Sequence, residues 1–265
     1  MDYRRGQLMI KFLRSELGSL ADKQVLDIGT GNGGITLAFA DESRLTVGVD
    51  IDRQNCAVLQ TASRLDHPLA HLHVLRAAGE SLPFRSASFD LVIVNGVMEW
   101  VGKNARDPSA EQKRFLADVA RVLSPQGTLY LAIENRMFLA FLLVDPHTHQ
   151  PFVNLLPRRL SSILTKAFGR HEFGNYIYSW WGLRNLIRES LPTLEFYLPI
   201  PHYHDPYRYA PLDDSDAIRK LSSELKRDVN FSIKSRLTLF YDWIVASLGA
   251  NRVALPYFVV LGRKL

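Results

Sequence analysis

Short apolar stretches alternate along the chain with segments whose apolar residues recur every three or four positions. The apolar stretches are typical of strands and occupy residues 25–28, 45–49, 71–76, 91–94, 128–133, 193–198 and 256–264. The periodic segments are typical of helices and occupy residues 3–17, 35–40, 52–64, 109–123, 179–191, 213–226 and 234–248. Strands and helices that alternate in this way form a mostly parallel sheet with right-handed crossovers. The pattern therefore predicts an α/β fold with a seven-stranded sheet and helices on both faces.

The alternation is interrupted after Glu134. Residues 136–178 contain the apolar run 137–144, followed by the sequence DPHTHQPFVNLLPRR. Long insertions between regular elements are commonly lids or substrate loops. We expect a single domain over residues 1–265, with residues 136–178 as a cap between the fifth strand and the next helix. Residues 199–211, rich in Pro and Tyr, are expected to form a loop.

A glycine cluster follows the first predicted strand, and the next strand ends on Asp50. The cluster, GTGNGG from Gly29 to Gly34, lets the backbone turn tightly and approach a ligand closely. A carboxylate at the tip of the second strand can accept both hydroxyls of a ribose. These residues therefore predict half of a nucleotide-binding βαβ unit.

Two kinds of cofactor compete for this turn. Gly29, Gly31 and Gly34 satisfy the G-x-G-x-x-G pattern of NAD(P) and FAD sites. Asp27 argues against those cofactors, because a carboxylate beside a helix N-terminus repels a pyrophosphate. S-adenosylmethionine instead carries an ammonium and a sulfonium, which the same carboxylate attracts. The charge at the turn therefore favours S-adenosylmethionine.

Motifs across residues 25–134 resemble those of the class I S-adenosylmethionine-dependent methyltransferases, in that family's order and spacing. They read DIGTGNG with VGVD, AAGESLPF, FDLVIVNGVMEW and LSPQGTLYLAIEN. The resemblance implies a Rossmann-like fold whose last strand runs antiparallel between the fifth and sixth strands. It implies S-adenosylmethionine as the cofactor, with these binding residues: Asp27, Gly29, Thr30, Gly31, Asn32, Gly33, Asp50, Ile51, Gly79, Glu80, Asn95 and Gly96. Ala78 stands where the family often has an aspartate that contacts the adenine amine, which leaves backbone groups of Gly79 and Glu80 for the adenine edge.

The second half of the chain resembles, more loosely, methyltransferases found with polysaccharide and lipopolysaccharide biosynthesis. The resemblance rests on IENR after the fifth strand, DPHTHQP and LLPR in the cap, and FVVLGRK near the end. It implies that the acceptor is a hydroxyl of a small or medium molecule, such as a saccharide or a lipid-linked glycan precursor.

Histidines of the predicted cap are candidates for the catalytic base. A hydroxyl acceptor has a high pKa, so its methylation usually needs a base or a metal ion. We predict His147 and His149 as catalytic, because neutral imidazole titrates near the working pH. His202 and His204, in the loop after the sixth strand, are alternatives. Asp145 with the two cap histidines has ligand-like spacing but no matched fourth ligand, so no metal is predicted.

Composition and charge bound the location and the partners. Hydrophobic residues make up 47% and charged residues 22%, as in an ordinary soluble protein, and a single cysteine, Cys56, suits a reducing cytoplasm. The longest apolar run, 137–144, is too short to span a bilayer. The net charge is +5, and a local basic excess occurs at Arg158, Arg159, Lys166 and Arg170. Such a patch fits an anionic lipid surface, a diphosphate-linked substrate or nucleic acid.

The sequence disfavours three other classes of function. A nucleic-acid methyltransferase is disfavoured because residues 89–100 lack the [DN]-P-P-[FYW] sequence used by enzymes that methylate base nitrogens. An NAD(P)-binding oxidoreductase is disfavoured by Asp27 and by the lack of a second mononucleotide-binding half. A non-catalytic binding protein is disfavoured because the glycine turn keeps both Asp27 and Asp50.

Overall fold

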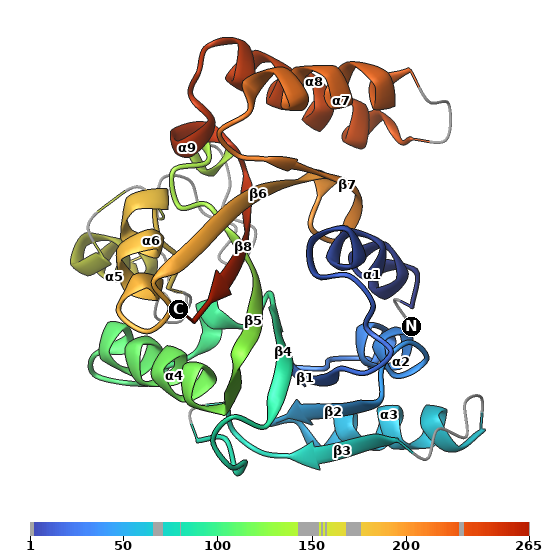
Figure 1. Ribbon diagram of the computed structural model, residues 1–265. Helices are drawn as coiled ribbons and strands as arrows, with labels where there is room; N and C mark the ends of the chain where they lie inside the picture. The colour runs from blue at the N-terminus through green and yellow to red at the C-terminus, as the bar shows by residue number, and fades with distance from the viewer. Residues whose placement is uncertain are drawn as a thin grey trace.

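A computed structural model describes residues 3–65, 71–79, 81–142, 154, 156, 158–167, 176–227 and 231–264. These residues build one eight-stranded sheet in the order β3-β2-β1-β4-β5-β8-β6-β7 (Figure 1). The strands are β1 Gln24–Ile28, β2 Leu45–Asp50, β3 Leu72–Arg76, β4 Phe89–Asn95, β5 Leu123–Glu134, β6 Thr193–His202, β7 Asp205–Pro211 and β8 Tyr257–Arg263. The helices are α1 Tyr3–Leu17, α2 Gly34–Ala40, α3 Arg53–Leu65, α4 Pro108–Val122, α5 Arg158–Ala167, α6 Trp180–Arg188, α7 Ser215–Lys226, α8 Ile233–Ser247 and α9 Asn251–Ala254, with 3-10 turns η1 Met98–Trp100 and η2 Leu139–Leu142.

The sheet confirms the predicted fold class. Strands β1 to β5 pair in parallel, and β8 runs antiparallel to both β5 and β6. The last strand therefore lies between the fifth and sixth, as the family resemblance implied. Because β1, β2, β4 and β5 are parallel, their carboxyl ends meet at one edge of the sheet, where ligands bind in open α/β folds.

The predicted strand count was one too low. Residues 199–211 are not a loop: they form the end of β6 and the whole of β7, an antiparallel hairpin at the edge of the sheet. Proline is tolerated in edge strands, where one row of amides has no partner to bond. Pro206 and Pro211 in β7 therefore gave a loop signal in a segment that pairs as a strand.

Helices cover both faces of the sheet (Figure 1). On one face, α4, α6, α7 and α8 bury their apolar sides in a cluster with Leu26, Val92 and Val260. On the other face, α1 and α2 pack against Val25 and Tyr130. Among the described residues, no helix combines the length and apolarity needed to cross a membrane.

The predicted N-terminal helix is a packing element of the second face. A Cβ atom on Gly6 of α1 would lie 2.5 Å from the Cβ of Ala38 in α2, so the two helices cross in close contact. The Phe12 ring stacks on Tyr209 of β7, with 3.9 Å between ring centroids. Helix α1 thereby joins the glycine-turn end of the sheet to its far edge.

Candidate functional site

A cleft of about 290 Å³ opens at the carboxyl ends of β1, β2 and β4. It is lined by Ile28, Gly29, Gly31, Val49, Asp50, Ile51, Ala77, Gly79, Gly96, Val97, Trp100 and Val101. The cleft thus brings together the glycine turn, the tip of β2 and the turn that follows β4. With Ala77 and Gly79 of the predicted adenine segment, these are the four places at which the sequence predicted cofactor contacts.

The turn after β1 requires glycine at two positions for steric reasons. Gly29 has φ of +78°, and a Cβ atom there would lie 2.3 Å from Cγ2 of Val97. Gly33 has φ of +82°, and its Cβ would lie 2.6 Å from Cδ1 of Leu59. A side chain at either position would be strained by the backbone and would collide with a neighbour.

The carboxylate of Asp50 borders the cleft at the tip of β2. Its Oδ2 accepts hydrogen bonds from the backbone N–H of Gly31 at 2.9 Å and from Nδ2 of Asn55 at 3.2 Å. Its Oδ1 accepts from the N–H of Asp52 at 2.8 Å. An amide that would face the pyrophosphate in a dinucleotide site therefore faces a carboxylate. This arrangement suits hydroxyl groups or positive charge and disfavours phosphate.

Asp27 lies beneath the turn and is not among the residues that line the cleft. It is 2% exposed, and Oγ1 of Thr36 in α2 donates a hydrogen bond to its Oδ2 at 2.6 Å. Burial, with a contribution from Asp50, raises the pKa of Asp27 to about 6, although the bond from Thr36 opposes the shift. Its predicted attraction for a cationic ligand would act through the field in the turn and stays a prediction.

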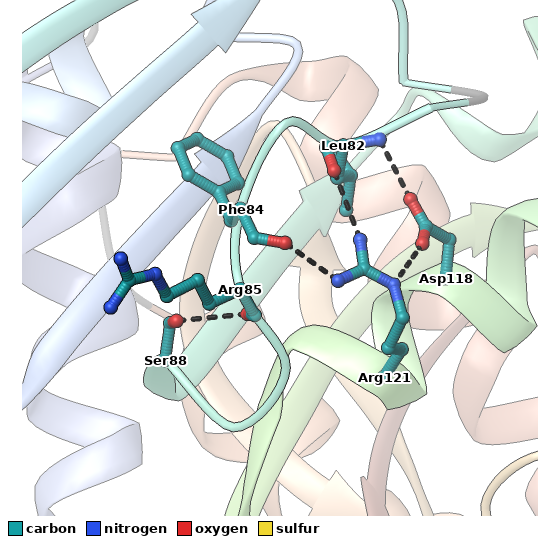
Figure 2. Close-up of polar contacts among 6 residues, drawn as sticks. All are labelled: Leu82, Phe84, Arg85, Ser88, Asp118 and Arg121. Carbon is teal, nitrogen blue, oxygen red and sulfur yellow. Dashed lines mark hydrogen bonds and ion pairs between the residues drawn. The ribbon is translucent and has the colours of Figure 1, made fainter.

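The segment predicted to meet adenine is held from below by a side-chain network. Figure 2 shows Arg121 of α4 directed at residues 82–84: it donates to the carbonyls of Leu82 and Phe84 at 2.9 and 2.6 Å. Asp118 accepts from Nε of Arg121 at 2.6 Å and from the N–H of Leu82 at 2.7 Å. These bonds fix the chain that follows Gly79, a cleft-lining residue.

The turn after β4 carries a buried polar atom that faces no hydrogen-bond donor. Oδ1 of Asn95 is buried and, among the described residues, has no such partner. The next residue, Gly96, has φ of +68° and lines the cleft. Buried polar groups in native proteins are normally bonded, so the Asn95 oxygen is suited to a donor from a ligand.

Acidic and aromatic side chains gather beyond Gly96. A Cβ atom on Gly96 would lie 3.6 Å from Oε1 of Glu99 and 3.4 Å from Cε2 of Tyr203. Burial raises the pKa of the Tyr203 phenol, and the charges of Glu134 and Glu99 raise it further. Glu134 ends β5 opposite Tyr257 of β8, and both glutamates are buried. Sequence reasoning left Glu134 out, and its only signal was its place at the tip of a predicted strand.

The predicted cofactor residues fall into three groups. Those that line the cleft are Gly29, Gly31, Asp50, Ile51, Gly79 and Gly96. Those that lie in the same turns without lining it are Asp27, Thr30, Asn32, Gly33 and Asn95. Glu80 lies outside the described residues. Their roles in binding stay predictions.

The predicted catalytic residues, His147 and His149, also lie outside the described residues, as does Asp145. Nδ1 of His202 accepts from the N–H of Asp205 at 3.1 Å, so this histidine holds the β6–β7 turn. Burial lowers the pKa of its ring. Within the described part of the chain, no three His, Cys, Asp or Glu side chains are grouped to hold a metal ion.

The two ends of the predicted cap lie beside this site. Arg136 donates to the carbonyls of Asn154 and Leu156, each at 2.7 Å. At the other end, the N–H of Tyr176 donates to the carbonyl of Glu99 at 2.8 Å. In the predicted basic patch, Arg158 and Arg159 begin α5, Lys166 is exposed in its last turn, and Arg170 lies outside the described residues.

The chain is similar in sequence to known methyltransferases. Residues 26–131 match the family model described as "Methyltransferase domain". A ubiquinone biosynthesis O-methyltransferase of Photobacterium profundum is 24% identical over 57% of this chain and 60% of its own length. A ribosomal protein L11 methyltransferase of Bradyrhizobium diazoefficiens is 34% identical over 45% of this chain and 39% of its own. The chain spans about half the length of the curated relatives it matches.

Solved structures share the fold over nearly the whole chain. A Haemonchus contortus phosphoethanolamine N-methyltransferase 2, solved with S-adenosylhomocysteine, is similar over 98% of this chain and 53% of its own, with TM-score 0.56 and 15% identity. A Methanosarcina mazei S-adenosylmethionine-dependent methyltransferase is similar over 92% and 93%, with TM-score 0.54 and 17% identity. Residues 26–131 therefore match a methyltransferase domain, and the chain shares its fold with solved S-adenosylmethionine-dependent methyltransferases.

Proposed function

We propose that the protein is an enzyme that transfers a methyl group from S-adenosylmethionine to a hydroxyl of a small or medium acceptor. The observation that carries the proposal is the Asp50 carboxylate, which borders the cleft and occupies the Gly31 amide of the glycine turn. A nicotinamide site also has a carboxylate at this strand tip for the ribose, but it leaves the amides of the glycine turn free for the pyrophosphate, and here Asp50 occupies the amide of Gly31. A ribose would offer its hydroxyls to the Asp50 carboxylate.

The residues present fit S-adenosylmethionine along the length of the cleft. Asp50 would hold the ribose, and Ile51 with Gly79 would border the adenine. The methionine end would lie toward Gly29 and Gly96, beside the end of β4, where the buried Oδ1 of Asn95 has no donor among the described residues. Asp27 beneath the turn would favour the positive charge of the cofactor's ammonium and sulfonium groups.

The acceptor would lie beyond Gly96. The bound cofactor supplies an activated methyl group, so the protein must position the acceptor and take its proton. Glu99, Glu134 and Tyr203 gather there, where carboxylate and phenol oxygens accept hydrogen bonds from hydroxyls. The acceptor oxygen would form the new bond to the methyl carbon as the carbon–sulfur bond breaks. The acceptor proton would pass to a base, for which His147 and His149 of the cap remain our candidates.

The acceptor class, the cap and the location belong to the same proposal. A saccharide or lipid-linked glycan precursor offers hydroxyls for the carboxylates and flat sugar faces for the aromatic rings. We place its entry under residues 136–178, as a cap on a single domain over residues 1–265, because both ends of that segment lie next to the site. A cytoplasmic place of action agrees with the free, buried thiol of Cys56. Nucleic acid is not proposed as a partner.

Thermal unfolding with and without ligands tests the cofactor assignment. S-adenosylhomocysteine at about 100 times its dissociation constant should raise the melting temperature by roughly 5–10 °C, whereas NAD and NADP should not. Asp50→Ala should abolish the shift, because the ribose loses its acceptor. Asp52→Ala is the matched control, since its carboxylate bonds the N–H of Gln54 outside the cleft lining. Stabilisation by NAD(P) alone would overturn the proposal, and a shift retained in Asp50→Ala would overturn the ribose site.

Product analysis tests the acceptor. Incubation with methyl-labelled cofactor and cell-envelope extract should yield a labelled methyl ether on a saccharide or glycan lipid. Label on an amine, a protein or a nucleic acid would refute O-methylation of a glycan while leaving the cofactor assignment in place.

A further inference from the structure

Helix α8 has an apolar surface on the side that faces away from the core. Ile233, Leu237, Phe240, Ile244 and Leu248 follow one another at intervals of three or four residues, so they form one stripe along the helix. Their exposed fractions are 80% for Ile233, 64% for Leu237, 44% for Phe240, 37% for Ile244 and 76% for Leu248. Trp243, 41% exposed, widens the stripe at its middle.

The inward face of the same helix contains polar groups. Ser235 and Asp242 are buried there beside Leu239, Val245 and Ala246. Leu239, Val245 and Ala246 pack into the core, so α8 has apolar residues on both sides, whereas an ordinary surface helix has polar residues on its outward face. A contiguous apolar patch on an otherwise polar surface usually marks an interaction site.

The stripe is bordered by cationic side chains. Nζ of Lys226, at the end of α7, lies 4.2 Å from the centroid of the Phe240 ring. Lys234 is exposed beside Ile233, and Arg236 donates to the carbonyl of Phe231. The single carboxylate of α8, Asp242, is buried on the opposite face. The outward face of α8 therefore combines apolar and positively charged groups.

We propose that α8 lies in the surface layer of an anionic lipid membrane, with its stripe of Ile233, Leu237, Phe240, Ile244 and Leu248 among the acyl chains. A 15-residue helix is about 22 Å long, sufficient to lie in the plane of the interface. Phe and Trp suit the level of the headgroups, and Lys stems extend along apolar surface while their ammonium groups reach phosphates. Helices α7 and α8 form one outer end of the molecule, so a flat surface can approach them (Figure 1).

The charge pattern favours lipid over a second protein as the occupant. The stripe lies along a projecting helix, not in a groove shaped to receive a partner's side chains. Lys226 and Lys234 at its borders complement the anionic headgroups of a leaflet. The net charge of +5 acts in the same direction. This contact does not depend on the proposed methyl transfer and can be tested without a methyl acceptor.

Vesicle co-sedimentation provides the test. The whole protein is mixed with vesicles of phosphatidylcholine alone or with about one quarter phosphatidylglycerol, and the pelleted fraction is measured. We expect binding to be about tenfold stronger on the anionic vesicles and to weaken with added salt. The double substitution Leu237→Glu with Ile244→Glu should lower the affinity at least about tenfold. Lys226→Glu with Lys234→Glu should remove the preference for anionic lipid.

A matched control separates the stripe from apolar surface in general. Val58 of α3 is 44% exposed and lies on the β2–β3 part of the fold, remote from α8 in Figure 1. Val58→Glu should bind vesicles as the unmodified chain does, and all variants should retain its melting temperature within a few degrees because the altered side chains are exposed.

Three results would overturn the proposal. The first is a protein that stays in the supernatant with both kinds of vesicle. The second is a Leu237→Glu and Ile244→Glu variant that binds as well as the Val58→Glu control. The third is a dimer, seen by light scattering without vesicles, that the double substitution dissociates, since it would assign the stripe to a second copy of the chain.

Discussion

Two buried carboxyl groups, one in each half of the molecule, have different surroundings. Asp27 in β1 accepts a hydrogen bond from Thr36, and its pKa is raised to about 6. Asp242 in α8 has no hydrogen-bond partner on either oxygen among the described residues. Burial alone raises the pKa of Asp242 well above its ordinary value. The hydrogen bond from Thr36 offsets part of the free-energy cost of burying Asp27, whereas no hydrogen bond among the described residues offsets the cost of burying Asp242.

These two carboxyl groups illustrate two different reasons why a fold can contain a residue that lowers its stability. Asp27 reduces stability at neutral pH but lies under a turn that would receive a cationic ligand, so its charge has a use in the proposed site. Asp242 lies on the inward face of a helix whose outward face is apolar. The outward stripe of the same helix is also unfavourable in water, and the proposed contact with lipid would give that stripe apolar surroundings.

Removal of Asp242 should have the largest effect on stability. A carboxyl whose pKa is raised in the folded state contributes stability below about pH 4 that is lost as the pH rises. The free energy of unfolding of Asp242→Ala should therefore rise relative to that of the unmodified chain as the pH increases through the raised pKa of Asp242. Denaturant unfolding across the pH range measures this difference, and S-adenosylhomocysteine should still stabilise the variant.

Asp242→Asn is the matched control for ionisation. It should show the same loss of pH dependence but a smaller gain, because its buried amide still lacks partners. Equal pH profiles for Asp242→Ala and the unmodified chain would show that Asp242 has a partner in solution.

Asp27→Asn should have the next largest effect. Since the folded pKa is about 6 against an ordinary value of 3.8, stability present at about pH 4 is lost as the pH rises to about 7. The difference corresponds to about two pKa units, or about 3 kcal/mol, and the variant should not show this loss. Affinity for S-adenosylmethionine should fall by about tenfold. Affinity for S-adenosylhomocysteine, whose sulfur is uncharged, should fall by less, and calorimetry measures both.

Thr36→Val sharpens this prediction. It removes the hydrogen bond that favours the ionised form of Asp27, so the loss of stability with pH should become larger and extend to higher pH. If Asp27→Asn binds both ligands as the unmodified chain does, the field of this carboxylate has no part in cofactor choice.

The first half of the fold could be predicted because its signals are local. Each of β1, β2 and β4 is a short apolar run that ends at a residue with its own chemical signature, such as Gly29 or Asp50. The edge strand β7 could not be predicted in the same way. Its partner is the adjacent strand β6, and the prolines that mark loops elsewhere are acceptable at a sheet edge.

The candidate site could be predicted where it consists of backbone turns and not where it consists of distant side chains. Gly29, Gly31 and Asp50 lie within one continuous motif and line the cleft. Glu134 and Tyr203 come together only because β8 and β6 follow β5 in the sheet. No local pattern in the sequence predicts that these two side chains lie together, so the acceptor side of the candidate site could be identified only from the structure.

Arg121→Ala tests the hydrogen-bonded carboxylate of Asp118, in the same half of the molecule as Asp27, and should have the smallest of the three effects. The substitution leaves the carbonyls of Leu82 and Phe84 without their donors (Figure 2), which should lower the free energy of unfolding by about 2 kcal/mol. Hydrogen exchange at residues 77–84 should accelerate, and affinity for S-adenosylhomocysteine should fall a few-fold because the predicted adenine segment is held less firmly. Arg114→Ala is the control: this exposed arginine of the same helix pairs with Glu111 three residues before it, so its loss should change stability by less than about 0.5 kcal/mol. If the two variants unfold alike, the hydrogen bonds of Arg121 do not organise the cleft. The comparison with Asp242, which has no partner among the described residues, would then depend on Asp27 alone.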